Sequence, residues 1–353
     1  MIRITAAMTA SGLNPAMSRD ANRAMATWLL LCCALVITMI VVGGITRLTH
    51  SGLSIVEWQP LLGAIPPLNE ADWVALFEKY KLTPEYQKVN AGMPLEGFKS
   101  IFWWEYLHRL LGRGIGTVFL LPYLWFLARR AVHGATAWKL AGIFVLGGLQ
   151  GAMGWYMVKS GLVDDPRVSH FRLTAHLGLA FVILAAMLWV AMDLLSPRAT
   201  APDASLRGRR VLAWHVVGFV VLMVLTGGLV AGLRGGHAYN TFPLMNGHVV
   251  PPEILQIDPL WKNFFWNIAT VQFDHRLFAW LLAFTVPLLW WKCRDVPGAR
   301  LATGVLLAIL ALQVTLGIST LLLHVPVALG VAHQGVASLV LCAALWSAHS
   351  LSR

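Results

Sequence analysis

The chain has 353 residues, of which 58% are hydrophobic and only 12% are charged, about half of the charged fraction of a typical soluble domain. A soluble core of this length cannot bury so much apolar surface, which excludes a water-soluble enzyme and indicates a polytopic membrane protein. The 27 basic residues outnumber the 16 acidic ones. In a membrane protein this excess reflects cytoplasmic loops and contact with anionic lipid, so it does not favour a nucleic-acid partner.

Eight apolar segments are long enough to cross a bilayer, because a helical span needs about 20 mainly apolar residues. In chain order they are 24–46, 103–127, 138–158, 172–195, 211–233, 267–291, 301–323 and 327–349. Residues 1–23 are polar and lack the pattern of a signal peptide, so we expect a short disordered arm. The sequence therefore predicts an all-α polytopic membrane protein with eight transmembrane helices.

The distribution of charge orients these spans. Arginines and lysines concentrate in the first residues, in the short connections and at the last residue, whereas the long connections 47–102 and 234–266 lie on the opposite face. By the positive-inside rule the short connections and both termini are cytoplasmic, in an inner (cytoplasmic) membrane.

The chain also contains an internal repeat, in which motifs of the first four spans recur in the same order in the last four. The matched pairs are Gly43-Gly44 with Gly227-Gly228, Glu105-Tyr-Leu-His108-Arg109 with Gln272-Phe-Asp-His275-Arg276, Leu149-Gln150 with Leu312-Gln313, and Ala175-His176 with Ala332-His333. We therefore predict two tandem four-helix bundles, 24–195 and 211–350, joined by a cytoplasmic linker, 196–210. Because each unit has an even number of spans, the pseudo-symmetry axis should follow the membrane normal.

Four histidines occupy matching depths in this repeat. His108, His176, His275 and His333 each lie a few residues past the outer start of a span, roughly 6–12 Å below the boundary at 1.5 Å per residue. Two imidazoles per bundle can supply the two axial ligands of a haem iron, whereas a zinc site needs four ligands. The alternative for any one of them is a hydrogen-bonded histidine that packs between helices. His50 and His237 follow the two Gly-Gly motifs and are weaker candidates, which would cover a haem from outside.

One position distinguishes the two halves. Three residues before the first histidine of each bundle, the first half has Glu105 and the second has Gln272. A carboxylate at this spacing faces the same cavity as His108 and can exchange a proton, whereas an amide cannot. The alternative is that Glu105 only favours a helix N-terminus or pairs with Arg109. Arg109 and Arg276 could bind haem propionates, or reach to the membrane interface.

These motifs resemble the haem A synthase family, eight-span proteins of bacterial and mitochondrial inner membranes. The segments Gly43-Gly44-Ile-Thr-Arg47-Leu-Thr-His50 and Asn267-Ile-Ala-Thr-Val-Gln272 add to a resemblance that covers about residues 25–350. It implies oxidation of the C8 methyl of haem O to a formyl group by successive hydroxylations, which gives haem A and requires oxygen and an electron donor. It also implies a functional link to haem O synthase and to the assembly of terminal cytochrome oxidases.

The same resemblance assigns roles to the residues. His108 and His176 would bind the substrate haem O in the first bundle, with Glu105 beside them as the catalytic acid. His275 and His333 would ligate the iron of a haem b cofactor in the second bundle. Some members carry a cysteine pair in the first outside loop, but neither long connection of this chain contains a cysteine.

Two other classes of function compete with this interpretation. A bis-histidine b-type cytochrome would pass electrons from quinol to a partner without modifying haem, and only the reactivity of Glu105 separates it from the enzyme. A transporter would place polar residues along a midplane path, whereas the middle of each span here is mainly Leu, Val, Ala and Phe.

Overall fold

The computed structural model describes residues 15–59, 62–163, 166, 168–196 and 203–352. Within these ranges the chain is helical and contains no β-strand, apart from one isolated bridge between Met245 and His248. Eight of the described helices have 24 residues or more. They are α1 (Pro15–Leu48), α4 (Leu95–Ala128), α5 (Gly134–Gly161), α6 (His170–Leu195), α7 (Arg207–Gly232), α9 (Ile268–Cys293), α10 (Pro297–Leu322) and α11 (Val327–Ser350).

The eight long helices correspond in order to the eight predicted spans, but only seven of those described are apolar enough to cross a membrane by length and composition. The exception is α9, because its polar cluster Gln272–Arg276 lowers the apolar content of its outer half. The structure therefore supports a multi-pass membrane protein with seven candidate spans. The eighth span remains a prediction.

Several helices begin before the predicted boundaries. α1 starts at Pro15 instead of residue 24, so part of the segment expected to be a disordered arm is helical. α7 starts at Arg207, inside the predicted linker, and α4 starts at Leu95, directly after Pro94. Hydrophobicity marks where a helix enters the apolar region, whereas the helix itself continues into water until a cap or a proline ends it.

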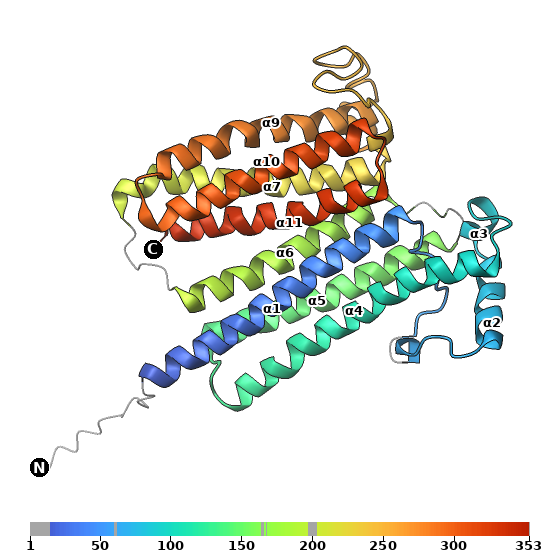
Figure 1. Ribbon diagram of the computed structural model, residues 1–353, viewed down its shortest axis with the longest axis horizontal. Coiled ribbons are helices and arrows are strands. Elements are labelled where there is room, and N and C mark those ends of the chain that lie inside the picture. Colours follow the sequence, from blue (N-terminus) through green and yellow to red (C-terminus); the bar gives the residue numbers. More distant parts are fainter. Residues whose placement is uncertain (1–14, 60–61, 164–165, 167, 197–202, 353) are drawn as a thin grey trace, which may run out of the picture.

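The long helices run side by side along one common direction (Figure 1). The start of α1 and the end of α11 lie at one end of the molecule, and α2 (Glu70–Lys81), α3 (Pro84–Lys88) and the connection after α7 lie at the other. Both long connections therefore lie at the same end, as the charge distribution requires.

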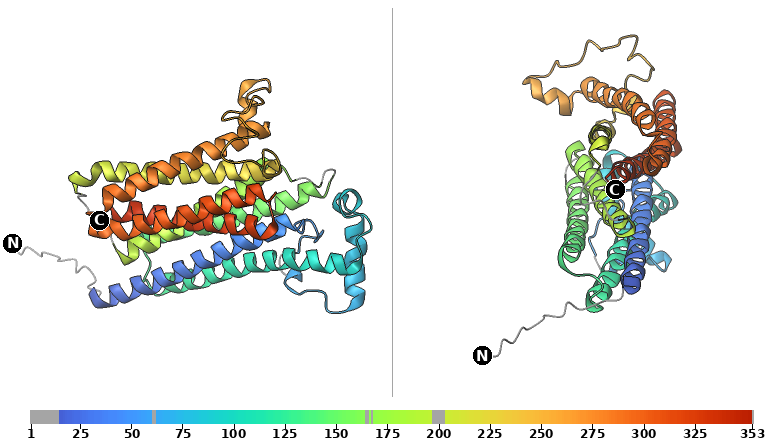
Figure 2. Two further views of the ribbon diagram at one scale, coloured as in Figure 1. Left: turned by 45° about the horizontal axis from the view of Figure 1, so that its top comes forward. Right: turned by 90° about the vertical axis from the view of Figure 1, so that its left-hand side faces the viewer.

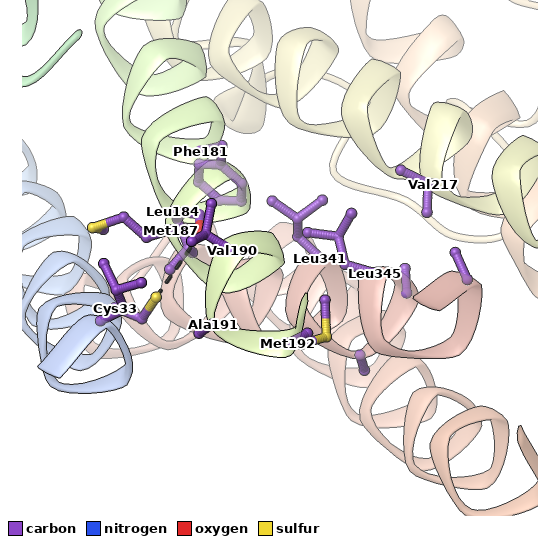
Figure 3. Packing of buried hydrophobic residues seen from close by; sticks show 14 of the residues in the cluster. Cys33, Phe181, Leu184, Met187, Val190, Ala191, Met192, Val217, Leu341 and Leu345 are labelled. Atoms are coloured by element: carbon purple, nitrogen blue, oxygen red, sulfur yellow. Dashed lines mark hydrogen bonds between the residues drawn. The ribbon is translucent and has the colours of Figure 1, made fainter. Parts of the chain in front are cut away.

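Four helices form the centre of the molecule. α1 and α6 pack against α7 and α11, while α4 and α5 flank one side and α9 and α10 the other (Figure 2). Figure 3 shows Cys33 of α1, Leu184 of α6, Val217 of α7 and Leu341 of α11 within this centre. The hydrophobic core is thus shared by the two halves of the chain.

The first outside connection folds onto the outer end of α4. Asn69 caps α2 by accepting a hydrogen bond from the Asp72 amide at 2.9 Å, which satisfies an otherwise unpaired donor. Phe77 and Tyr80 of α2 then pack on Phe98 of α4 in a small apolar cluster of their own. The second connection contains three short helical segments, which are η3 (Gly235–His237), η4 (Leu260–Lys262) and α8 (Asn263–Trp266).

Candidate functional site

Each of the four predicted ligand histidines lies against a glycine of a neighbouring helix. A Cβ atom added to that glycine would meet the histidine Cε1 atom at close to or below the limit of van der Waals contact. The pairs are Gly43 with His108 (3.0 Å), Gly154 with His176 (3.2 Å), Gly227 with His275 (3.1 Å) and Gly317 with His333 (2.8 Å). In both halves, the third helix supplies the glycine for the histidine of the fourth, and the first helix supplies the glycine for the histidine of the second.

The histidines lie in two pairs. His108 of α4 and His176 of α6 are close enough for their charges to interact, and so are His275 of α9 and His333 of α11. Within the described parts of the chain, no group of three or more His, Cys, Asp or Glu side chains could hold a metal ion. Two paired imidazoles with glycine seats suit the two axial positions of a haem, whose porphyrin supplies the other four ligands.

A glutamine accompanies the second histidine of each pair. The Gln150 Nε2 atom donates to the His176 carbonyl at 3.0 Å and lies 3.4 Å from His176 Nε2. The Gln313 Nε2 atom lies 3.5 Å from His333 Nε2. Among the described residues, the Oε1 atoms of both glutamines are buried without a hydrogen-bond partner. Each of these amides therefore lies next to the Nε2 atom of its histidine.

Glu105 anchors the first outside connection. It is 2% exposed, and its Oε2 atom accepts hydrogen bonds from Ser54 Oγ at 2.7 Å and from the Ile55 amide at 2.8 Å. Its Oε1 atom accepts from Arg109 at 2.5 Å, and Arg109 also donates to the Ile55 and Glu57 carbonyls. The i, i+4 pair is thus formed, and the carboxylate is held one turn before His108.

Gln272 anchors the second outside connection in the corresponding way. Its amide donates hydrogen bonds to the connection, whereas the Glu105 carboxylate accepts them. Its amide Nε2 donates to the Gly235 and Ala238 carbonyls at 2.7 and 2.6 Å, and its Oε1 accepts from Arg276 at 3.1 Å. Arg276 also donates to the Tyr239 carbonyl at 2.7 Å. Both arginines therefore bind loop carbonyls, and their pairing with propionates stays a prediction.

The positions that follow the two Gly-Gly pairs match in conformation. His50 lies six residues after Gly44 and Arg234 six after Gly228, and their φ angles are 54° and 55°. The residue equivalent to His50 is therefore Arg234, whereas His237 lies one turn further on. Burial, with Arg234 and Arg47 nearby, lowers the pKa of His50.

A cleft opens at the outer end of the first half, beside the Glu105 anchor. Its volume is about 370 Å³, and its walls include Trp58 of the first connection, Arg109 of α4, and Trp155 and Lys159 of α5. Two cations and two large aromatic rings suit a flat ligand that carries carboxylates.

The two halves also touch directly next to His333. Gln334, the neighbour of His333 on α11, donates to the Ile40 carbonyl of α1 at 2.6 Å. A Cβ atom at Gly44 would meet the Gln334 amide at 3.1 Å, so α1 and α11 approach closely where α1 also seats His108.

Comparison with known proteins places this arrangement in a family. Residues 26–345 match the COX15-CtaA family, described as cytochrome oxidase assembly protein. The chain belongs to this family. The match covers six of the eight long helices in full and most of α1 and α11, including both histidine pairs.

Bacterial relatives named heme A synthase are similar over nearly the whole chain. The protein of Nitrosospira multiformis is 61% identical over 336 residues, which cover 94% of each chain. That of Nitrosomonas eutropha is 55% identical over 93% of this chain and 94% of its own. That of Paramagnetospirillum magneticum is 50% identical over 96% of both.

Sequence reasoning did not give the environment of the histidines. It predicted the four imidazoles and interpreted Gly43-Gly44 and Gly227-Gly228 only as repeat markers, whereas the structure makes one glycine of each pair a histidine seat. It also missed Thr226, whose Oγ1 atom lies 3.0 Å from His275 Nδ1. The sequence feature that could have indicated Thr226 is the residue before each Gly-Gly pair, which is Val42 in the first half and Thr226 in the second.

Proposed function

We propose that this chain is a haem A synthase, which oxidises the C8 methyl of haem O to the formyl group of haem A. The observation that carries the proposal is the pair of glycine-seated histidine pairs, together with the carboxylate of Glu105 that is anchored one turn before His108. Membership of a cytochrome oxidase assembly family and the names of the relatives favour this enzyme over an electron-carrying cytochrome.

We place the substrate haem O between His108 and His176 and the haem b cofactor between His275 and His333. A haem b in the second half would supply electrons to the reaction. Three residues before its first histidine, the first half has a group that can move a proton, Glu105, where the second has the amide of Gln272. It also has the cleft at Arg109, through which a large flat substrate can approach.

Glu105 is suited to this role because its position is fixed. Three donors hold the carboxylate in place, so it does not need to reorganise when charge develops next to it.

The proposal includes the membrane arrangement. α9 becomes the eighth span, because it is as long as α6, α7 and α10 and packs between α7 and α10. The matching histidine seats support a tandem pseudo-symmetric repeat. Both termini are then cytoplasmic, and both haem sites lie near the outer face of the inner membrane.

The test is pigment extraction followed by mass analysis of purified variants. Glu105→Gln should retain haem b and accumulate haem O, with haem A formation reduced at least about 100-fold, whereas Glu105→Asp keeps a carboxylate and should retain part of the activity. Ser54→Ala is the matched control, because it removes one anchoring bond but leaves the carboxylate. Normal haem A from Glu105→Gln, or equal losses from Ser54→Ala and Glu105→Gln, would contradict a chemical role for Glu105.

A further inference from the structure

The four histidines differ in what holds their Nδ1 atoms. In His108, His176 and His333 this atom is buried and, within the described residues, has no hydrogen-bond partner. In His275 it lies 3.0 Å from the Thr226 hydroxyl. Among the described residues, one imidazole of the four is therefore held by a side-chain hydrogen bond at its Nδ1 atom.

The direction of this hydrogen bond follows from counting protons. A threonine hydroxyl has one proton and two lone pairs. The Thr226 hydroxyl lies 3.0 Å from the Leu222 carbonyl and 3.2 Å from the Met223 carbonyl, so its proton is directed to the helix backbone. With its own proton on the backbone, Thr226 can accept the proton of His275 Nδ1, and the His275 ring also has a backbone hydrogen bond to Met223. This tautomer leaves Nε2 with a free lone pair.

Such a bond is what a metal-binding histidine needs. A partner at one ring nitrogen fixes the tautomer and the ring orientation and makes the other nitrogen a stronger donor. Gly227, the next residue along α7, forms the seat of the same ring. Thr226 and Gly227 together therefore fix both the chemistry and the position of His275.

The first half has no hydrogen-bonding side chain at the position equivalent to Thr226. Alignment of the two Gly-Gly pairs puts Val42 opposite Thr226, and valine has no hydrogen-bonding group. Gly43 still seats His108, but the His108 Nδ1 atom remains unpaired among the described residues. The two halves share the seat and differ in the hydrogen bond.

We propose that Thr226 is a positioning residue that makes the second haem site permanent, and that Val42 leaves the first site exchangeable. This inference rests on the proposed function, because it takes His275 as a haem ligand. A substrate must be bound and released at every turnover, whereas a cofactor must stay. Threonine at position 226 retains the haem of the second half, whereas valine at position 42 allows the haem of the first half to be released.

The test compares Thr226→Val, which keeps the shape of the side chain, with Thr226→Ser, which keeps the hydroxyl. Purified proteins are mixed with excess apomyoglobin as a haem acceptor, and the loss of the bis-histidine b-type spectrum is followed. We expect Thr226→Val to lose haem b roughly 10–100-fold faster than wild type and to show a higher midpoint potential. Thr226→Ser should behave like wild type.

The reciprocal change, Val42→Thr, tests the first half independently of any folding defect in Thr226→Val. It should slow the transfer of the haem in the first half to apomyoglobin by a similar factor. The inference is wrong if Thr226→Val keeps wild-type haem retention and potential, or if Val42→Thr leaves exchange unchanged. The variants His275→Ala and His333→Ala distinguish a failure of the role of Thr226 from a failure of the proposed function. If both retain the b-type spectrum, the ligand assignment fails, whereas loss of haem in these two with retention in Thr226→Val overturns only the role of Thr226.

Discussion

Gly317→Ala tests the histidine seat most directly, because this seat is the tightest of the four. The added Cβ atom would lie 2.8 Å from His333 Cε1, whereas carbon atoms pack best at about 3.5–4.0 Å. The imidazole must retreat by roughly 0.7 Å, more than the ~0.5 Å that a preorganised ligand tolerates. Overpacking of this kind costs about 1–3 kcal/mol, which corresponds to a roughly 5–150-fold loss of haem b affinity.

The cost should arise only when haem is bound. In the free protein the ring can rotate away from the new methyl group, so the thermal midpoint of the haem-free protein should stay near that of wild type. Haem b affinity is measured by titrating haem into haem-free protein and following the bis-histidine spectrum.

Gly304→Ala is the matched control. It lies on the same helix and gains the same helix propensity, but its Cβ atom would meet Trp290 at an ordinary 3.6 Å. Equal haem affinities in Gly317→Ala and Gly304→Ala would refute the role of the glycine as a seat.

Three further predictions concern other parts of the molecule. Gly43→Ala, with a Cβ atom 3.0 Å from His108, should remove haem O binding and leave the b-type spectrum intact; loss of both would contradict separate sites. Burial of Glu85 raises its pKa from 4.5 to about 7, so the folded state binds the extra proton and stability should fall, by on the order of 1–3 kcal/mol, as pH rises through this window. Glu85→Gln should abolish that slope in denaturation at about pH 5 and pH 8, and an unchanged slope would exclude Glu85 as its source. Asp193→Asn weakens the 3.0 Å pair with buried His349 and should lower stability by about 1–3 kcal/mol, measured as a lower thermal midpoint.

The elements that the sequence predicts well are those governed by one-dimensional patterns. Span length and loop charge are such patterns, and the long helices follow the predicted order. The exact helix ends were missed, because α4 begins at Leu95 after Pro94 in a segment that is not apolar enough to mark a span. The amphipathic helix α2 was missed for a related reason. Its buried residues Phe77 and Tyr80 are too few to stand out in a chain that is apolar almost throughout.

The site could be predicted as residue types but not as contacts. The repeat and the depth of the spans indicated His108 and its three counterparts. The anchoring of Glu105 by Ser54 and Ile55 depends on how the outside connection folds back onto α4, and no spacing rule contains that information. The Thr226 bond depends on the rotation of α7 relative to α9, which is set by packing across the whole interface.

The contact between α1 and α11 links the two histidine pairs through the helix backbones. Gln334 follows His333 and donates to the Ile40 carbonyl of α1, within a turn of the glycine that lies against His108. Packing between α1 and α11 therefore couples the positions of His108 and His333 directly. A larger residue at Gly44 should disturb both histidines together, because its Cβ atom would meet the Gln334 amide at 3.1 Å.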